Sequence, residues 1–137
     1  MDIDDDKSVV GTATFTTKVN VIARDMDYLA CDAAMFGSWW HTLYYDEKNR
    51  CIVTIIADPE AEEGDWENPD EGFIKKTLSG QEIAEAIAKA IDCGWDRCYP
   101  KNALAEFAAT GDWGGGYDSV VADGVLQYAI FGDIIYG

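Results

Sequence analysis

The chain has 137 residues and a hydrophobic fraction of 48%, so it carries enough apolar material for a buried core without a disulfide or a metal. Its 26 acidic and 10 basic side chains give a formal net charge of -16. Such a charge repels phosphate backbones and anionic membranes, which argues against direct nucleic-acid binding and membrane binding and leaves two roles for the charge, solubility or attraction of a basic protein surface.

The first residues predict the compartment. Residues 1–7 are acidic and lack the apolar stretch of a secretory signal, and no apolar run approaches the roughly 20 residues that cross a bilayer. We therefore expect a reducing cytoplasm, in which the four cysteines stay as free thiols. We also expect residues 1–8 to form a disordered acidic tail and residues 9–137 to form one domain.

The first half of the chain predicts strands around one helix. Residues 9–21 alternate between apolar and polar side chains, which is the pattern of a half-buried strand. Asp25 is a suitable cap for a short helix that ends before Gly37. Residues 38–45 and 51–56 then form a β-hairpin across a polar turn.

Aromatic side chains crowd both faces of the first hairpin strand. By strict alternation Trp39 and Trp40 point to opposite faces, and Tyr44 shares a face with Trp40. Core packing is the simplest role for these rings. Because aromatic patches with polar handles also suit protein interfaces and nucleobase pockets, we predict these three residues as ligand or partner contacts.

Residues 57–72 form an acidic loop with eight carboxylates and no basic residue. The dipeptides Asp58-Pro59 and Asn68-Pro69 indicate that the loop is not helical. The loop lacks the alternating Asp pattern and central Gly of a calcium-binding EF-hand loop, so we predict no metal site there. We predict that it provides an acidic docking surface, made of Glu60, Glu62, Glu63, Asp65, Glu67, Asp70 and Glu71.

The second half predicts mostly helices. Residues 73–78 form a third strand of the hairpin sheet, and the S-x-x-E pattern at 79–82 is a capping box that opens a helix. A short helix is expected at 103–109. The last helix, over about 118–130, is apolar nearly all round, so we place it in the core or at a subunit interface. Residues 131–137 are expected to be a buried extended segment.

One carboxylate in the last helix needs an explanation. Asp123 lies one turn inside an otherwise apolar helix, and a buried carboxylate needs a partner. Gln127, four residues later on the same face, is placed to hydrogen-bond with it. The pair either orients a backbone or a subunit contact, or lines a ligand or partner site.

A glycine-rich loop precedes the last helix. Trp113 and Tyr117 flank three glycines, an arrangement that lets a backbone approach a ligand while the rings stack on a base. No Gly-Lys-Ser/Thr follows, so this is not a phosphate-binding loop of the nucleotide-hydrolase type. The alternative is a solvent-exposed linker.

The sequence lacks a recognisable set of catalytic groups. His41 is the only histidine, and no GxSxG, HExxH or Cys–His signature accompanies it. Cys93 and Cys98 are not at the CxxC spacing of redox or zinc sites. We therefore predict a protein with no enzymatic activity, metal or cofactor.

The end of the chain, DGVLQYAIFGDIIYG over residues 123–137, resembles the C-terminal signature of a family of small bacteriophage proteins, D-x-I-V-Q-x-A-L-F-G-E-V-V-Y-G. The family is also similar where a helix leads into the strand that begins after Gly37. The resemblance implies a phage origin and an accessory role in the host bacterial cytoplasm, and it implies no mechanism. The matching positions are Trp39, Trp40, Asp123, Gln127, Phe131, Gly132, Tyr136 and Gly137.

Together these patterns predict an α+β fold, in which a small antiparallel sheet of three to four strands packs against three to four helices. The favoured function is a non-enzymatic phage accessory protein that counters host defence by docking its acidic surface on a host nuclease or immune effector. Two alternatives stay open. One is the sequestration of a nucleotide-derived immune signal in an aromatic pocket, and the other is a structural or regulatory role as a small homo-oligomer.

Overall fold

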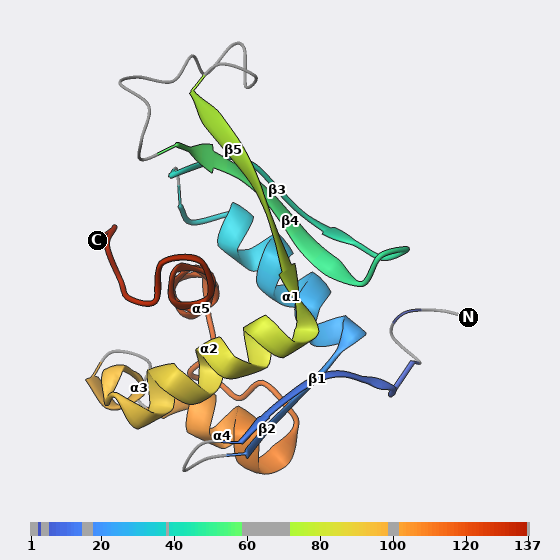
Figure 1. The fold of residues 1–137 in the computed structure, drawn as a ribbon. Coiled ribbons are helices and arrows are strands. Elements are labelled where there is room, and N and C mark those ends of the chain that lie inside the picture. The colour runs from blue at the N-terminus through green and yellow to red at the C-terminus, as the bar shows by residue number, and fades with distance from the viewer. Residues whose placement is uncertain are drawn as a thin grey trace.

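The computed structural model describes residues 3, 6–14, 18–37, 39–58, 72–98 and 102–136. The described elements confirm the predicted α+β class. In chain order they are β1 (Val9–Thr14), β2 (Lys18–Ile22), α1 (Ala23–Ala34), β3 (Trp40–Asp46), β4 (Cys51–Ala57), β5 (Phe73–Ser79), α2 (Gly80–Asp92), α3 (Trp95–Cys98), α4 (Ala103–Thr110) and α5 (Ser119–Phe131) (Figure 1).

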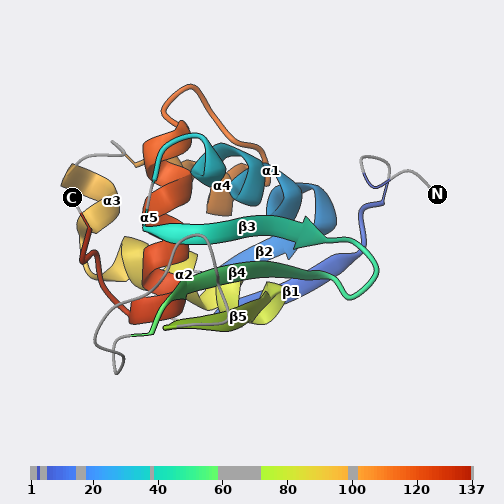
Figure 2. The same ribbon diagram turned by 90° about the horizontal axis from the view of Figure 1, so that it is seen from above.

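Helix α5 lies between α1 and α2 and contacts both (Figures 1 and 2). Residues 121–128 of this helix are all buried, as expected for a helix that is apolar nearly all round. Asp118 caps the N-terminus of the helix, because its Oδ1 accepts a hydrogen bond from the N–H of Val121 at 2.9 Å. Within the described residues, no helix combines the length and apolarity needed to cross a membrane.

Strands β3, β4 and β5 form an antiparallel sheet in that order. The face that carries Ile52, Ile56 and Leu78 joins the helices in one hydrophobic core. A bulge between Trp40 and Thr42 shifts the register, so that Trp40 lies opposite Ile56 on the helix-facing side. Strict alternation from the sequence was therefore wrong at this point.

The strand expected over residues 9–21 is instead a two-stranded hairpin. Strands β1 and β2 pair antiparallel, with Thr14 opposite Lys18. The sequence between them contains no Gly, Pro, Asn or Asp, so alternation alone suggested one continuous strand. Val19 and Val21 are fully buried, as the alternation predicted.

Local hydrogen bonds explain where α2 and α1 begin. The predicted capping box is confirmed: Ser79 Oγ accepts from the N–H of Glu82, and Glu82 Oε1 accepts from the N–H of Ser79, both at 3.1 Å. Asp25 lies inside the first turn of α1 rather than before it, and its Oδ2 accepts from the N–H of Ile22 at 3.0 Å. The carboxylates of Glu82 and Asp25 also stabilise the N-terminal ends of these helices electrostatically.

The short helix α3 was not predicted from the sequence, and it supplies a cap for α4. Asp96 in α3 is 1% exposed, and its two oxygens accept the N–H groups of Leu104 and Ala105 at 2.8 and 3.0 Å. A carboxylate from a separate element thus satisfies the free donors of the first turn of α4. Sequence spacing cannot reveal such a cap, because the capping residue does not adjoin the helix.

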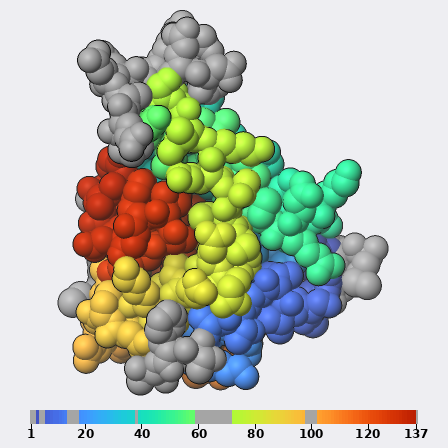
Figure 3. Space-filling view, in the orientation of Figure 1, coloured from blue at the N-terminus to red at the C-terminus, as the bar shows by residue number. Residues whose placement is uncertain are grey.

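Strand β1 and the start of α2 touch backbone to backbone, with the blue and yellow-green segments in contact in Figure 3. A Cβ added at Gly11 would clash with the backbone of Gly80, whereas one added at Gly115 would meet nothing within 4 Å.

We expect Gly11→Ala to lower the free energy of unfolding by about 1–3 kcal/mol in urea titrations. The matched control Gly115→Ala should change it by less than about 0.5 kcal/mol, and equal effects of the two variants would contradict this packing.

Candidate functional site

The candidate site is built around the carboxylate of Asp123, which is 3% exposed. Its Oδ1 accepts a hydrogen bond from the indole N–H of Trp39 at 2.6 Å, and its Oδ2 accepts from the amide of Gln127 at 2.8 Å. The predicted contact between Asp123 and Gln127 is therefore confirmed. The hydrogen bond from Trp39 was not predicted, because Trp39 lies 84 residues before Asp123 in the chain.

Gln127 also holds the C-terminal tail, defined here as residues 133–136. Its amide N–H donates to the carbonyl of Tyr136 at 3.0 Å, and its Oε1 accepts the N–H groups of Ile135 and Tyr136 at 2.9 and 2.8 Å. The tail is thus fixed through its backbone. The expectation of a buried extended segment over residues 131–137 was wrong about burial, because none of the described residues 131–136 is buried and the side chains of Ile135 and Tyr136 are 55% and 44% exposed.

Three rings pack around the same point. The ring of Tyr136 stacks on Trp39 with centroids 5.9 Å apart and planes 4° apart, and Phe131 meets both rings edge-on. Gly37 leaves room for this arrangement, because a Cβ there would lie 2.5 Å from Asp123 Oδ1. The network therefore joins the end of α1, the start of β3, α5 and the tail.

A cavity of about 110 Å³ opens beside this network. We call it the α5 cavity. Its wall combines aromatic and aliphatic side chains with the polar pair on α5, and none of its described lining residues is a Lys or an Arg. The lining residues are Phe36, Trp95, Val120, Asp123, Gly124, Gln127, Ile134 and Tyr136.

Asp123 differs from the other buried carboxylates in its position within a helix. Burial raises its pKa, and the hydrogen bonds from Trp39 and Gln127 oppose this rise. Neither of the ion pairs found between described residues involves it. Asp25 and Asp96 accept backbone N–H groups at helix N-termini, whereas Asp123 lies within α5 and accepts the side-chain N–H groups of Trp39 and Gln127.

The predicted residues Trp113 and Tyr117 form a separate cluster. Trp113 stacks on Phe107 with centroids 3.8 Å apart and lies 4.5 Å from the ring of Tyr117. The hydroxyl of Tyr117 donates to Asp32 Oδ2 at 2.6 Å, and burial together with this bond raises its pKa. This glycine-rich segment is therefore packed against α1 and α4 rather than a free linker. Whether its rings bind a ligand stays a prediction.

Trp113 also faces a buried carboxylate. Burial raises the pKa of Asp25, while the N–H of Ile22, the charge of Arg24 and the indole of Trp113 oppose the rise. Asp25 Oδ1 and Trp113 Nε1 are both buried, and neither forms a hydrogen bond of good geometry.

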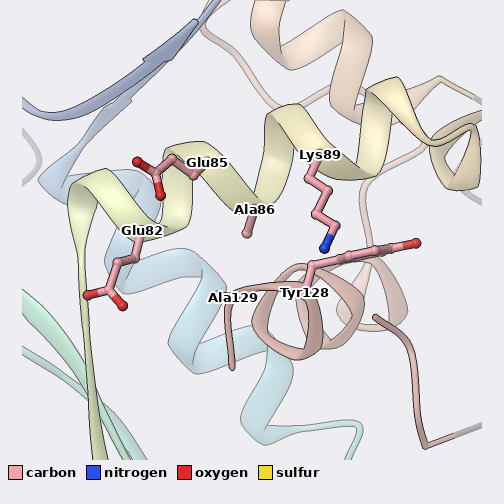
Figure 4. A pocket seen from close by; sticks show the side chains of 6 residues that line it. All are labelled: Glu82, Glu85, Ala86, Lys89, Tyr128 and Ala129. Carbon is pink, nitrogen blue, oxygen red and sulfur yellow. The ribbon is translucent and has the colours of Figure 1, made fainter. Parts of the chain in front are cut away.

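A second hollow, of about 230 Å³, lies between α2 and α5 (Figure 4). Lys89 reaches from α2 towards the ring of Tyr128, and its Nζ lies near Gly132, where the carbonyl end of α5 favours a positive charge. Glu82 and Glu85 line the other end of the hollow. The positive charge of Lys89 therefore lies near the C-terminal end of α5, and the other charged residues that line the hollow are the two glutamates.

The remaining predicted contacts are dispersed. Trp40 is half-buried on the helix-facing side of the sheet, whereas Tyr44 is 48% exposed on the outer side. The acidic docking surface lies outside the described residues. Sequence reasoning missed Phe36 and Trp95, because no local pattern distinguishes them from ordinary apolar positions.

His41 contacts neighbours on the sheet. Its Nδ1 lies 2.8 Å from Thr42 Oγ1, and its ring meets Phe73 edge-on. Among the residues that the structure describes, no group of three or more His, Cys, Asp or Glu side chains is arranged to hold a metal ion.

A comparison with known proteins adds no relative: no family model, curated protein or solved structure matches the chain.

Replacing Gln127 should release the tail. We expect Gln127→Met to lower the free energy of unfolding by about 1–3 kcal/mol, because it leaves an oxygen of Asp123 and two tail N–H groups without partners. Hydrogen exchange should show faster exchange at Ile135 and Tyr136 than the loss of global stability explains. Unchanged relative protection of these two amides would contradict this role.

The titration of Asp123 should show its burial. Because its pKa is raised on folding, its ionisation should lower stability as the pH rises from the unfolded value of 3.8 through the higher native pKa. Carboxyl ¹³C NMR should give a midpoint above 3.8 for Asp123 and a lower one for Asp46, whose pKa is lowered by hydrogen bonds from Asn49. A midpoint for Asp123 at or below that of Asp46 would overturn this assignment.

Proposed function

We propose that this protein is a non-enzymatic bacteriophage accessory protein that counters host defence by docking its acidic surface on a host nuclease or immune effector. The observation that carries the proposal is the net charge of -16. The resemblance of residues 123–137 to small phage proteins supports the phage origin.

Little of this charge is paired within the described residues. The ion pairs found there join Arg24 to Asp112 and Arg50 to Asp6, both at 3.8 Å, and Asp112 is 82% exposed. Exposed surface pairs at this distance contribute little stability. Most of the negative charge therefore acts on the surroundings rather than on the fold.

Exposed carboxylates also occur among the described residues. On α2, Glu82 and Glu85 project from neighbouring turns (Figure 4). Glu106, Asp112 and Asp118 are exposed on α4 and in the segment before α5. An extended anionic surface speeds association with a cationic one, and nucleases bind the phosphates of DNA through cationic grooves.

The α5 cavity gives less support to the alternative of nucleotide sequestration. It is ring-lined, as a base would require, but its charged group is a carboxylate, which repels phosphate. Its volume of about 110 Å³ is also below the roughly 300 Å³ of small ligand sites. Docking on a basic protein is therefore the function that we favour.

The test begins with capture of basic proteins from a bacterial host lysate on the immobilised chain. The association rate of a purified candidate is then measured while ionic strength rises from about 0.01 M to about 1 M, which shortens the screening length from about 30 Å to about 3 Å. We expect a fall of about tenfold or more. The candidate should also lose its nuclease or effector activity when the chain binds.

Two variants of the acidic docking surface sharpen this test. Converting its seven carboxylates to amides should slow association at low salt, whereas interchanging its Glu and Asp residues keeps the charge and should leave the rate unchanged. Salt-independent association would contradict the proposal, and turnover of a substrate by the chain itself would contradict its non-enzymatic part.

A further inference from the structure

The α5 cavity combines three aromatic rings with one carboxylate. Phe36, Trp95 and Tyr136 line it together with Asp123. The faces of aromatic rings carry negative potential, so groups of rings attract cations such as ammonium and guanidinium. A carboxylate among the rings adds a full negative charge.

Two of the three rings, those of Tyr136 and Trp95, are held in place by the surrounding fold. Tyr136 stacks on Trp39, and its backbone is fixed by Gln127. Trp95 meets the ring of Tyr128 edge-on at 5.7 Å and lies over Gly124, where any Cβ would clash with it. A site whose walls are already fixed loses less entropy when a ligand binds.

The cavity is open to solvent at its aromatic rim. Phe36 is 45% exposed and Tyr136 is 44% exposed. The volume of about 110 Å³ is below the roughly 150 Å³ that accept benzene, so it suits the charged end of one side chain. The site is therefore of the size of an anchoring pocket for a single residue.

Asp123 retains capacity for a further partner. Each of its oxygens accepts one hydrogen bond, whereas a carboxylate can accept about four. Its donors are neutral, so a cation is the partner that would most stabilise its charge. The net charge of -16 also favours the approach of cations over anions.

We infer that the α5 cavity binds the ammonium or guanidinium group of a Lys or Arg side chain presented by a basic protein, with Phe36, Trp95 and Tyr136 around the cation and Asp123 as its counter-ion. The inference rests on the proposed docking function and assigns its anchoring point. A purely apolar occupant would remove water from Asp123 without replacing it. A second copy of the chain would bring another charge of -16.

The direct test is an NMR titration of the indole N–H signals with blocked single amino acids. The probes are N-acetyl-lysine methylamide, its trimethyl-lysine counterpart, N-acetyl-arginine methylamide and the neutral N-acetyl-norleucine methylamide. We expect saturable shifts of the Trp95 and Trp39 signals with at least one cationic probe, and a response at least about fivefold weaker with norleucine. The signal of Trp113 serves as the internal reference.

Two variants at the rim give a matched comparison. Phe36→Ala removes one ring without touching the Asp123 hydrogen bonds, and we expect it to weaken binding about fivefold or more. Met35→Ala changes the neighbouring side chain, which is 82% exposed and outside the cavity, and should leave binding unchanged. Asp123→Asn should abolish the preference for cations, and if it fails to fold, Phe36→Ala still decides.

Several results would overturn the inference. They are the absence of a saturable shift at about 0.1 M probe, where even a Kd of roughly 10 mM would be visible, an equal response to norleucine, and unchanged binding in Phe36→Ala. Dimerisation that Phe36→Ala removes, without any response to cations, would assign the cavity to a second copy instead.

The two proposals can fail separately. If a basic partner binds with the expected salt dependence but equally well to Phe36→Ala, the docking function stands and the cavity inference falls. If the cationic probes bind but no basic host protein does, the cavity is a site for ammonium or guanidinium groups, and the docking function falls together with the anchoring role of the cavity.

Discussion

The burial of one ionisable group organises the C-terminal third of this protein. A carboxylate inside an apolar helix is costly unless its oxygens are satisfied, and Asp123 meets this need with Trp39 and Gln127. Both partners then have further consequences. Trp39 carries the ring on which Tyr136 stacks, and Gln127 binds the backbone of the tail. The α5 cavity exists because these contacts fix its walls.

The surface follows a different physical rule from the interior. Inside, the described carboxylates Asp25, Asp96 and Asp123 each have a defined hydrogen-bonding role. Over the whole chain the 26 acidic side chains outnumber the 10 basic ones, and their summed field acts over the distance that salt permits. At the α5 cavity a buried carboxylate, Asp123, lies close to the exposed side chains of Phe36 and Tyr136.

Local patterns predicted much of the fold, and their failures have a common cause. The capping box at Ser79 and the cap at Asp118 were predictable because both contacts span three residues. The hairpin of β1 and β2 was missed because no turn residue marks its reversal, and the bulge at Trp40 because a bulge leaves no trace in alternation. Both are properties of how two strands pair, which the alternation within one strand does not express.

By itself the sequence determined the α+β class, the negative charge and the contact between Asp123 and Gln127, because composition and the helical repeat express these directly. Only the tertiary structure decided that Trp39 completes the network, that Phe36 and Trp95 line the cavity beside it, and that Trp113 packs on Phe107. These contacts join elements that lie far apart in sequence. Their geometry follows from how α1, α3, α5 and the tail pack together, which no local spacing encodes.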